Sequence, residues 1–271
     1  MGNFTGFVRM NYLCGMKLHF RKIGEGEPVI ILHGLFGSSD NWQTFGKQLA
    51  TSGFAVYLVD LRNHGQSPHD PEFTYNALAG DIDELMRDEQ LENAIMIGHS
   101  LGGKTAMAFS FQHPDKVKAL VVIDIAPKQY PVHHRSILDA LLGIDVNKIT
   151  SRQDAETILA QQINQQATLQ FLLKNLYWKT KDSLDWRFNL EVINKEISNV
   201  GSETLPSSSF EKPTLFIKGE KSDYISFDDE KEIFELFKKV EVKTAPGAGH
   251  WVHAENPEWL LDTLVKFIAG I

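Results

Sequence analysis

Cysteine is almost absent from this sequence of 271 residues, which contains only Cys14. A single thiol cannot form an internal disulfide or a thiolate metal cluster, and this scarcity is typical of a reducing compartment. Long hydrophobic runs are also absent: no apolar segment is long enough to span a bilayer, and residues 1–20 lack the continuous apolar core of a signal peptide. We therefore predict a cytoplasmic protein with no membrane partner.

Basic residues are outnumbered by acidic ones. Lys and Arg total 27 against 35 Asp and Glu, so the formal net charge is −8 at pH 7. That balance gives no electrostatic support for a nucleic-acid partner. The ten histidines show no metal-ligand spacing, so no metal site is predicted. The hydrophobic fraction of 42% is ordinary for a globular protein, and a small-molecule ligand is the favoured partner.

Short apolar runs alternate along the chain with longer amphipathic segments. The runs predict buried parallel strands at 28–33, 54–60, 94–98, 119–124, 214–219 and 240–245. The three- and four-residue apolar spacing between them predicts crossover helices at 42–50, 76–88, 101–112, 229–238 and 257–268. Residues 18–23, followed by Gly24 and Gly26, alternate like a strand of an antiparallel edge hairpin. The whole pattern predicts an open, doubly wound, mostly parallel α/β sheet.

The alternation is interrupted between Pro127 and Pro206, where helical patterns occur without a convincing strand. We predict a helical insertion at 127–206, placed after the sixth strand, and a core made of 1–126 and 207–271. The insertion is either a plain subdomain with its own small core or a cap over a substrate, since such caps lie at the carboxyl edge of a sheet. Under a cap, an acyl pocket would be lined by Leu172, Leu173, Trp178, Trp186 and Phe188.

The segment GHSLGGKT, residues 98–105, fits two active-site motifs at once. As G-x-S-x-G it predicts a nucleophile elbow with Ser100 at the tip of a strand-to-helix turn. As G-x-x-x-x-G-K-[ST] it predicts a phosphate-binding loop, with Lys104 on phosphates and Thr105 on magnesium. The apolar strand that ends at Asp124 would also suit the second interpretation. Features elsewhere in the chain favour the first.

Those features are an early turn and a late histidine. The turn HGLFG follows strand 28–33, and we predict that the backbone amides of Leu35 and Leu101 form an oxyanion hole. His250, in the glycine-rich loop GAGHWVH, could reach back to Ser100 as general base and then acid, with His253 as the alternative. Two further candidates for substrate contact neighbour these features, namely Phe36 and Trp251.

Two acids could orient the histidine. Asp124 and Asp223 each follow a predicted strand, and either one preserves the chain order Ser, Asp, His. Asp124 ends a buried strand, where a charge is costly unless it is paired. It could instead serve as a helix cap or loop anchor beside Pro127.

Several segments together resemble the α/β-hydrolase superfamily: HGLFGSSDNW, LVDLRNHGQSP, IGHSLGGK, IDIAP, DWRFNL and GAGHWVHAENP. Within it the chain is similar to small bacterial esterases akin to mammalian alpha/beta-hydrolase domain protein eleven. The resemblance implies an α/β-hydrolase fold and a cofactor-free serine carboxylesterase with a helical cap. Its implied substrates are short to medium acyl esters and acyl-CoA thioesters. In that group the acid follows the strand after the elbow helix, which favours Asp124 and leaves Asp223 as the reserve.

Two other functions stay open on the sequence alone. A nucleotide hydrolase would use the phosphate-loop interpretation of Lys104 and Thr105, and it would bind ATP with magnesium. A non-catalytic protein of the same fold would keep the serine and histidine but mainly bind a small ligand. The sequence does not define the oligomeric state or the acyl length.

Overall fold

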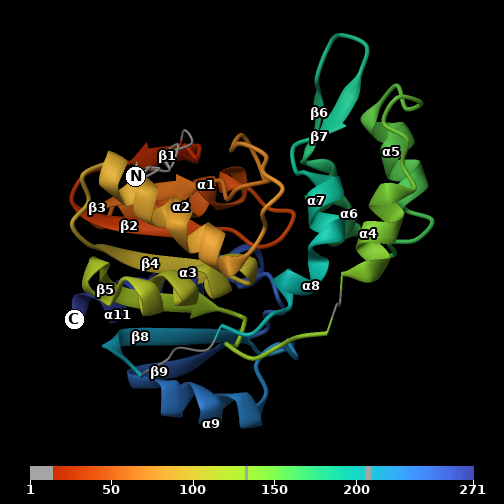
Figure 1. The fold of residues 1–271 in the computed structure, drawn as a ribbon. Coiled ribbons are helices and arrows are strands. Elements are labelled where there is room, and N and C mark those ends of the chain that lie inside the picture. The colour runs from red at the N-terminus through yellow and green to blue at the C-terminus, as the bar shows by residue number, and fades with distance from the viewer. Residues whose placement is uncertain (1–14, 132–133, 205–208) are drawn as a thin grey trace, which may run out of the picture.

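A seven-stranded sheet forms the centre of the protein in a computed structural model that describes residues 15–131, 134–204 and 209–271 (Figure 1). The strand order is β1-β3-β2-β4-β5-β8-β9, and only β1 is antiparallel to its neighbour. The strands are β1 (Phe20–Ile23), β2 (Glu27–Leu32), β3 (Phe54–Val59), β4 (Ala94–His99), β5 (Val117–Ile123), β8 (Phe210–Gly219) and β9 (Phe237–Ala245). The predicted open, mostly parallel α/β sheet is confirmed. Cys14 lies outside the described residues.

Helices cover both faces of the sheet, which explains why β3 and β4 are buried along their whole length. One hydrophobic core joins the sheet to α2 (Tyr75–Asp88), α3 (Leu101–Gln112) and α9 (Phe227–Leu236). A second core on the other face includes residues of α1 (Gln43–Ala50) and α11 (Pro257–Ala269). Short helices complete this part of the chain at η1 (Ser39–Trp42), η2 (Pro114–Lys116) and α10 (Val252–Glu255).

The predicted edge hairpin is wrong. β1 pairs with β3, with Phe20 opposite Val59, while both edges of β2 are occupied by β3 and β4. The turn between β1 and β2 crosses the chain near Gly53, and a Cβ on Gly26 (φ +119°) would lie 2.0 Å from the Gly53 carbonyl oxygen. The insertion follows β5, which is the fifth strand of the described residues rather than the sixth.

The insertion lies beyond the carboxyl ends of the sheet strands, as a separate group of elements (Figure 1). Its elements are α4 (Arg135–Leu142), α5 (Arg152–Leu159), α6 (Gln166–Leu173), β6 (Leu176–Trp178), β7 (Leu184–Trp186), α7 (Leu190–Lys195) and α8 (Ile197–Val200). The expectation of no strand here was wrong, since β6 and β7 pair as an antiparallel hairpin. Its turn, 179–183, contains neither glycine nor proline and so gave no hairpin signal.

The predicted boundary at 206/207 falls outside the described residues. Within those residues, no helix is both long enough and apolar enough to cross a membrane.

Candidate active site

Ser100 lies at a sharp turn between the end of β4 and the start of α3. Its φ is 53° and its ψ is −117°, a conformation that non-glycine residues rarely adopt and that costs free energy. The turn is crowded with backbone: a Cβ on Gly98 would lie 2.1 Å from the Gly102 carbonyl oxygen, and one on Gly102 would lie 2.3 Å from that of Leu32. The two glycines of the motif are therefore required by close backbone contact. The strand, turn and helix are those of a nucleophile elbow.

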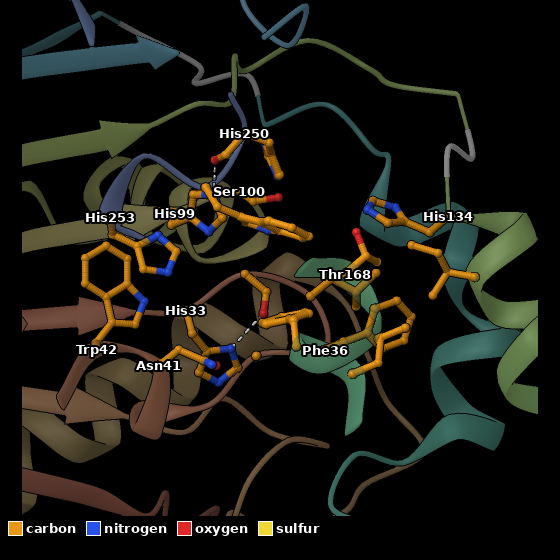
Figure 2. Close-up of a pocket in the computed structure, with 17 residues that line it drawn as sticks. His33, Phe36, Asn41, Trp42, His99, Ser100, His134, Thr168, His250 and His253 are labelled. Carbon is orange, nitrogen blue, oxygen red and sulfur yellow. Dashed lines mark hydrogen bonds between the residues drawn. The ribbon is translucent and has the colours of Figure 1, made fainter. Parts of the chain in front are cut away.

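His250 contacts Asp124, and the contact joins two loops that are far apart in sequence. The Nδ1 atom of His250 lies 2.7 Å from Oδ2 of Asp124. An ionised carboxylate only accepts hydrogen bonds, so Nδ1 carries the proton and Nε2 is left as the acceptor. Figure 2 shows His250 and Ser100 at the same wall of a pocket. This arrangement gives Asp124, rather than Asp223, the position next to the imidazole.

Asp124 is fully buried and receives two further hydrogen bonds. The Gly219 amide donates to Oδ1 at 2.9 Å, and the Ser222 hydroxyl donates to Oδ2. With the imidazole, these donors compensate the cost of a buried carboxylate. This role of Ser222 was not predicted from the sequence. Among the described residues, no hydrogen bond links the neighbouring Asp223 to His250.

Two aromatic rings fix the histidine loop, and the sequence interpretation missed both roles. Tyr224 stacks on the His250 imidazole, with ring centroids 4.0 Å apart and an interplanar angle of 18°. His99 donates through Nε2 to the His250 carbonyl oxygen at 2.8 Å, and burial holds the pKa of His99 well below its usual value. The alternative base, His253, stacks instead on Trp42 at 4.2 Å.

The turn after β2 lines the pocket, and the hydrogen bonding of its amides differs from residue to residue. The Phe36 amide donates to Nε2 of His64 at 3.3 Å, whereas the Leu35 amide has no such partner within the described ranges. The Leu101 amide is the first of α3, and first-turn amides have no partner inside their own helix. Within the described residues, the Leu35 amide in the turn after β2 and the Leu101 amide at the elbow are therefore both available to a ligand.

Buried histidines support that turn from beneath. His64 donates through Nδ1 to the Arg62 carbonyl oxygen at 3.0 Å, and burial lowers its pKa to about 3. His33 accepts the Leu61 amide at Nε2 at 3.0 Å, and burial also lowers its pKa. Both rings are therefore neutral near pH 7, so each offers one donor and one acceptor to the loops.

Ser100 and His250 line the same pocket. Its walls come from the turn after β2, the histidine loop and the insertion, which contributes Ile137, Thr168, Phe171 and Leu172 (Figure 2). Of the residues predicted to contact substrate, the lining includes Phe36, Leu172 and Trp251.

The remaining predicted pocket residues lie elsewhere. Phe188 packs against Phe36 from behind, with centroids 5.2 Å apart, and stacks on Trp186 at 5.3 Å. Leu173 is buried without lining this pocket, and Trp178 is 51% exposed on the β6–β7 hairpin. The prediction for these four residues is corrected because three of them form the core of the insertion and one faces outward.

Ser100 also lines a second pocket. It shares Ser100 and His134 with the first pocket, but His250 does not line it. Its other walls are largely apolar and aromatic, and they include Tyr75, Leu101, Ile125, Tyr130, Val200 and Tyr224. Ser100 therefore borders two pockets.

The groups that the phosphate-loop interpretation requires are engaged elsewhere. Lys104 is 1% exposed, and its ammonium donates to carbonyl oxygens of the insertion, including that of Lys128 at 2.7 Å. Burial lowers the pKa of Lys104 to about 7, while the charge of Glu203 opposes that effect. Thr105 donates to the Leu101 carbonyl oxygen at 2.9 Å. Neither side chain faces a phosphate position. Within the described part of the chain, no group of three or more His, Cys, Asp or Glu residues could hold a metal ion.

Comparison with known proteins identifies the family. A family model described as "alpha/beta hydrolase fold" matches residues 27–148. Esterase YbfF of Escherichia coli is 36% identical over 246 residues, which cover 90% of this chain and 94% of the relative. The chain therefore belongs to the α/β-hydrolase family, as its motifs predicted.

Particular relatives define the group more narrowly. The sn-1-specific diacylglycerol lipase ABHD11 of Danio rerio is 34% identical over 252 residues, covering 90% of this chain and 79% of the relative. The solved structure of a marine microorganism esterase superposes with a TM-score of 0.91 at 43% identity, covering 93% of this chain and all of the other. The protein is a hydrolase of this esterase group.

Proposed function

We propose that the protein is a serine carboxylesterase in which Ser100 is the nucleophile, His250 the general base and Asp124 the orienting acid. The observation that carries the proposal is the 2.7 Å contact between Asp124 and His250 at the edge of the sheet where the strained Ser100 turn lies. The same three residue types in this order act together in other serine hydrolases. Asp223 is kept as the alternative acid.

The proposed reaction proceeds through an acyl-enzyme. Ser100 Oγ attacks the ester carbonyl carbon while Nε2 of His250 takes the hydroxyl proton. The amides of Leu35 and Leu101 stabilise the resulting oxyanion. Collapse of the tetrahedral intermediate breaks the bond to the alcohol, which receives the proton from His250. Water, deprotonated by the same imidazole, then releases the carboxylic acid and restores Ser100. No cofactor is required.

The two pockets suggest how an ester would lie. Because His250 must protonate the leaving alcohol, the alcohol belongs in the pocket that His250 lines, beside Phe171 and Trp251. The acyl chain then extends into the second pocket, beside Tyr75 and Ile125. Mainly apolar walls of this kind suit short to medium acyl esters. Acyl-CoA thioesters are a second class to test, and the lipase name of the Danio rerio relative makes glycerolipid esters a third.

The insertion is the cap of this proposed site. Ile137, Phe171 and Leu172 reach the first pocket from α4 and α6, so substrate would bind between the insertion and the core. We accordingly assign residues 127–206 to the cap, and 1–126 with 207–271 to the catalytic core. A cytoplasmic location and a small-molecule partner remain our predictions.

Labelling with a fluorophosphonate tests the proposal directly. The probe should modify Ser100 in the wild-type protein, and p-nitrophenyl esters should be hydrolysed. Ser100→Ala should remove both labelling and hydrolysis while the thermal unfolding midpoint stays close to that of the wild type. Esterase activity that survives Ser100→Ala would refute the assignment. A protein that binds esters without turnover would instead support the non-catalytic alternative.

A further inference from the structure

Lys104 connects the elbow helix to both ends of the insertion. It lies one helical turn after Ser100, and its own amide donates to the Ser100 carbonyl oxygen at 3.0 Å. Its side chain is buried, and the ammonium has three carbonyl acceptors. One belongs to Lys128, at 2.7 Å, where the chain enters the insertion. The other two belong to Gly201, at 3.3 Å, and Ser202, where the chain returns.

These two connecting segments also bind each other. The Tyr130 amide donates to the Gly201 carbonyl oxygen at 2.7 Å, and the Thr204 amide donates to that of Pro127 at 2.7 Å. We call residues 127–131 and 200–204 the stem. The stem is a two-chain connection, and the Lys104 ammonium binds both of its chains.

The other groups around the Lys104 ammonium are mainly aromatic rings. Among the described residues, no carboxylate lies within ion-pair distance of Lys104. The ammonium lies 4.9 Å from the ring centroid of Tyr130 and 5.8 Å from that of Tyr75, so aromatic faces supply further stabilisation. A buried ammonium is costly unless it is fully hydrogen-bonded, and here the three bonds to the stem do this.

The same residues form part of the second pocket. Lys104, Tyr130 and Gly201 all line it, together with Ser100. Part of its wall therefore consists of stem residues, which Lys104 binds to α3. The stem has other contacts with the core. The Tyr130 hydroxyl accepts a hydrogen bond from the Ala126 amide and donates one to the Tyr224 carbonyl oxygen. Lys128 pairs with Asp229. A stem that moved away from α3 would widen or open this pocket. The hydrogen bond between Asp124 and His250 is made by two residues of the core and includes no stem residue.

We propose that Lys104 is a positioning residue that clamps the stem of the insertion against the elbow helix, and that it thereby sets the shape of the acyl pocket. This proposal rests on the proposed esterase function for its kinetic consequence, but its structural part does not depend on it. Lys104 touches neither the reacting atoms nor the histidine. Its effect reaches substrate through the part of the pocket wall that it forms together with Tyr130 and Gly201.

Lys104→Met tests the clamp, because it keeps most of the side-chain volume and removes all three N–H donors. Two substrates with the same leaving group, p-nitrophenyl acetate and p-nitrophenyl octanoate, separate short from long acyl chains. If the closed stem falls to about a tenth of the population, KM for the octanoate rises about tenfold. KM for the acetate and fluorophosphonate labelling of Ser100 should change by less than about twofold on the same reasoning.

Hydrogen exchange reads the stem itself. In Lys104→Met, the amides of Tyr130 and Thr204 should exchange faster, since both are held by bonds across the stem. Lys116→Met is the matched control: its half-buried ammonium binds Asp83 on the core, away from both pockets. It should change neither the octanoate KM nor exchange in the stem.

An equal change in KM for both esters, or unchanged exchange at Tyr130 and Thr204, would overturn the clamp. If Lys104→Met does not fold, Lys104→Gln replaces it, because its amide keeps two N–H donors. In that variant too, KM for the octanoate must rise more than KM for the acetate. Failure of the esterase proposal is recognised separately, because the wild type would then not be labelled at Ser100. Hydrogen exchange in the stem would still show whether Lys104 holds the stem against α3.

Discussion

Asp124→Asn is the sharpest test of the proposed catalytic residues, because the structure predicts how the substitution fails. The Gly219 amide donates to Oδ1 and therefore holds the carbonyl oxygen of the new amide on its own side. The amide nitrogen then faces Nδ1 of His250, where Oδ2 lay at 2.7 Å. A donor in that place requires an unprotonated Nδ1, so the proton moves to Nε2. That nitrogen can no longer accept the proton of Ser100.

The expected loss is large although the substitution changes one atom. Loss of the orienting carboxylate in a serine triad lowers kcat by about 10⁴-fold. At about 1.4 kcal/mol for each factor of ten, this corresponds to about 5.5 kcal/mol of transition-state stabilisation. Ser222 can rotate its hydroxyl to accept from the new amide, so the fold has a way to satisfy the buried group. We therefore expect the variant to be folded and inactive.

The assay is steady-state hydrolysis of p-nitrophenyl acetate, with thermal unfolding as the check on folding. Asp223→Asn is the matched control, because Asp223 lies one residue from Ser222 but is not bonded to His250 in the described structure. It should lose less than about threefold, since it is not the group that orients the imidazole. A larger loss in Asp223→Asn than in Asp124→Asn would refute the assignment, and similar losses would mean that both carboxylates act on the imidazole.

Three further predictions concern neighbouring groups. The pKa of His64 is about 3 in the fold and about 6.5 when unfolded, so the unfolded chain binds more protons between these values and stability falls as pH drops below 6.5. At pH 4.5 this costs about 2.7 kcal/mol, and urea unfolding of His64→Gln at pH 7 and 4.5 should lack that part of the loss. Ser222→Ala removes one of the three hydrogen bonds to Asp124. It should lower kcat by up to about tenfold, which corresponds to the free energy of one charge-assisted hydrogen bond. An unchanged kcat would show that this hydrogen bond does not contribute to catalysis. Ile125→Phe changes the second pocket, so it should alter the rate of deacylation measured after acylation with one common acyl group. Phe171→Ala changes the first pocket and should alter only the rate of acylation, because the alcohol has left before deacylation begins. The reverse pattern would mean that the acyl chain and the alcohol occupy the opposite pockets.

The fold could be predicted from the sequence because its strands carry strong local signals. Residues 94–98 are continuously apolar and are followed at once by small residues, and the structure has β4 and the start of α3 there. The error at the amino-terminal edge has a different origin. Alternation in residues 18–23 identifies a strand but not its partner. β1 cannot pair with β2, because β3 and β4 occupy both edges of β2, and it pairs with β3 instead.

The site was predicted in part for the same reason. Ser100 and Asp124 each directly follow the last residue of a strand, and such positions can be recognised in a sequence. The contributions of Ser222, Tyr224 and His99 could not be recognised, because they depend on loops that meet only after folding. The predictions of pocket residues were wrong most often in the insertion. Large apolar side chains there could cover a substrate or form a local core, and Trp186 and Phe188 form the core.

The register of the sheet explains why chemistry is concentrated at this edge. His99 and Ile123 are paired in β4 and β5, so the next residues, Ser100 and Asp124, leave adjacent strands at the same level. Both have positive φ values, 53° and 52°, each costing about 1–3 kcal/mol. Both are still held by the sheet: the Ser100 amide donates to Ile123 at 3.0 Å, and the Asp124 amide donates to Ile217 at 2.7 Å.

In a regular strand, each of these side chains would point to one of the two faces of the sheet. The left-handed turn instead directs it out of the strand while its amide remains in the ladder. The strain is therefore located in the two residues that the proposed reaction uses, and the hydrogen bonds of the central strands compensate it. His250 needs no such strain, because it comes from a loop after β9 and is oriented by Asp124 and by the ring of Tyr224.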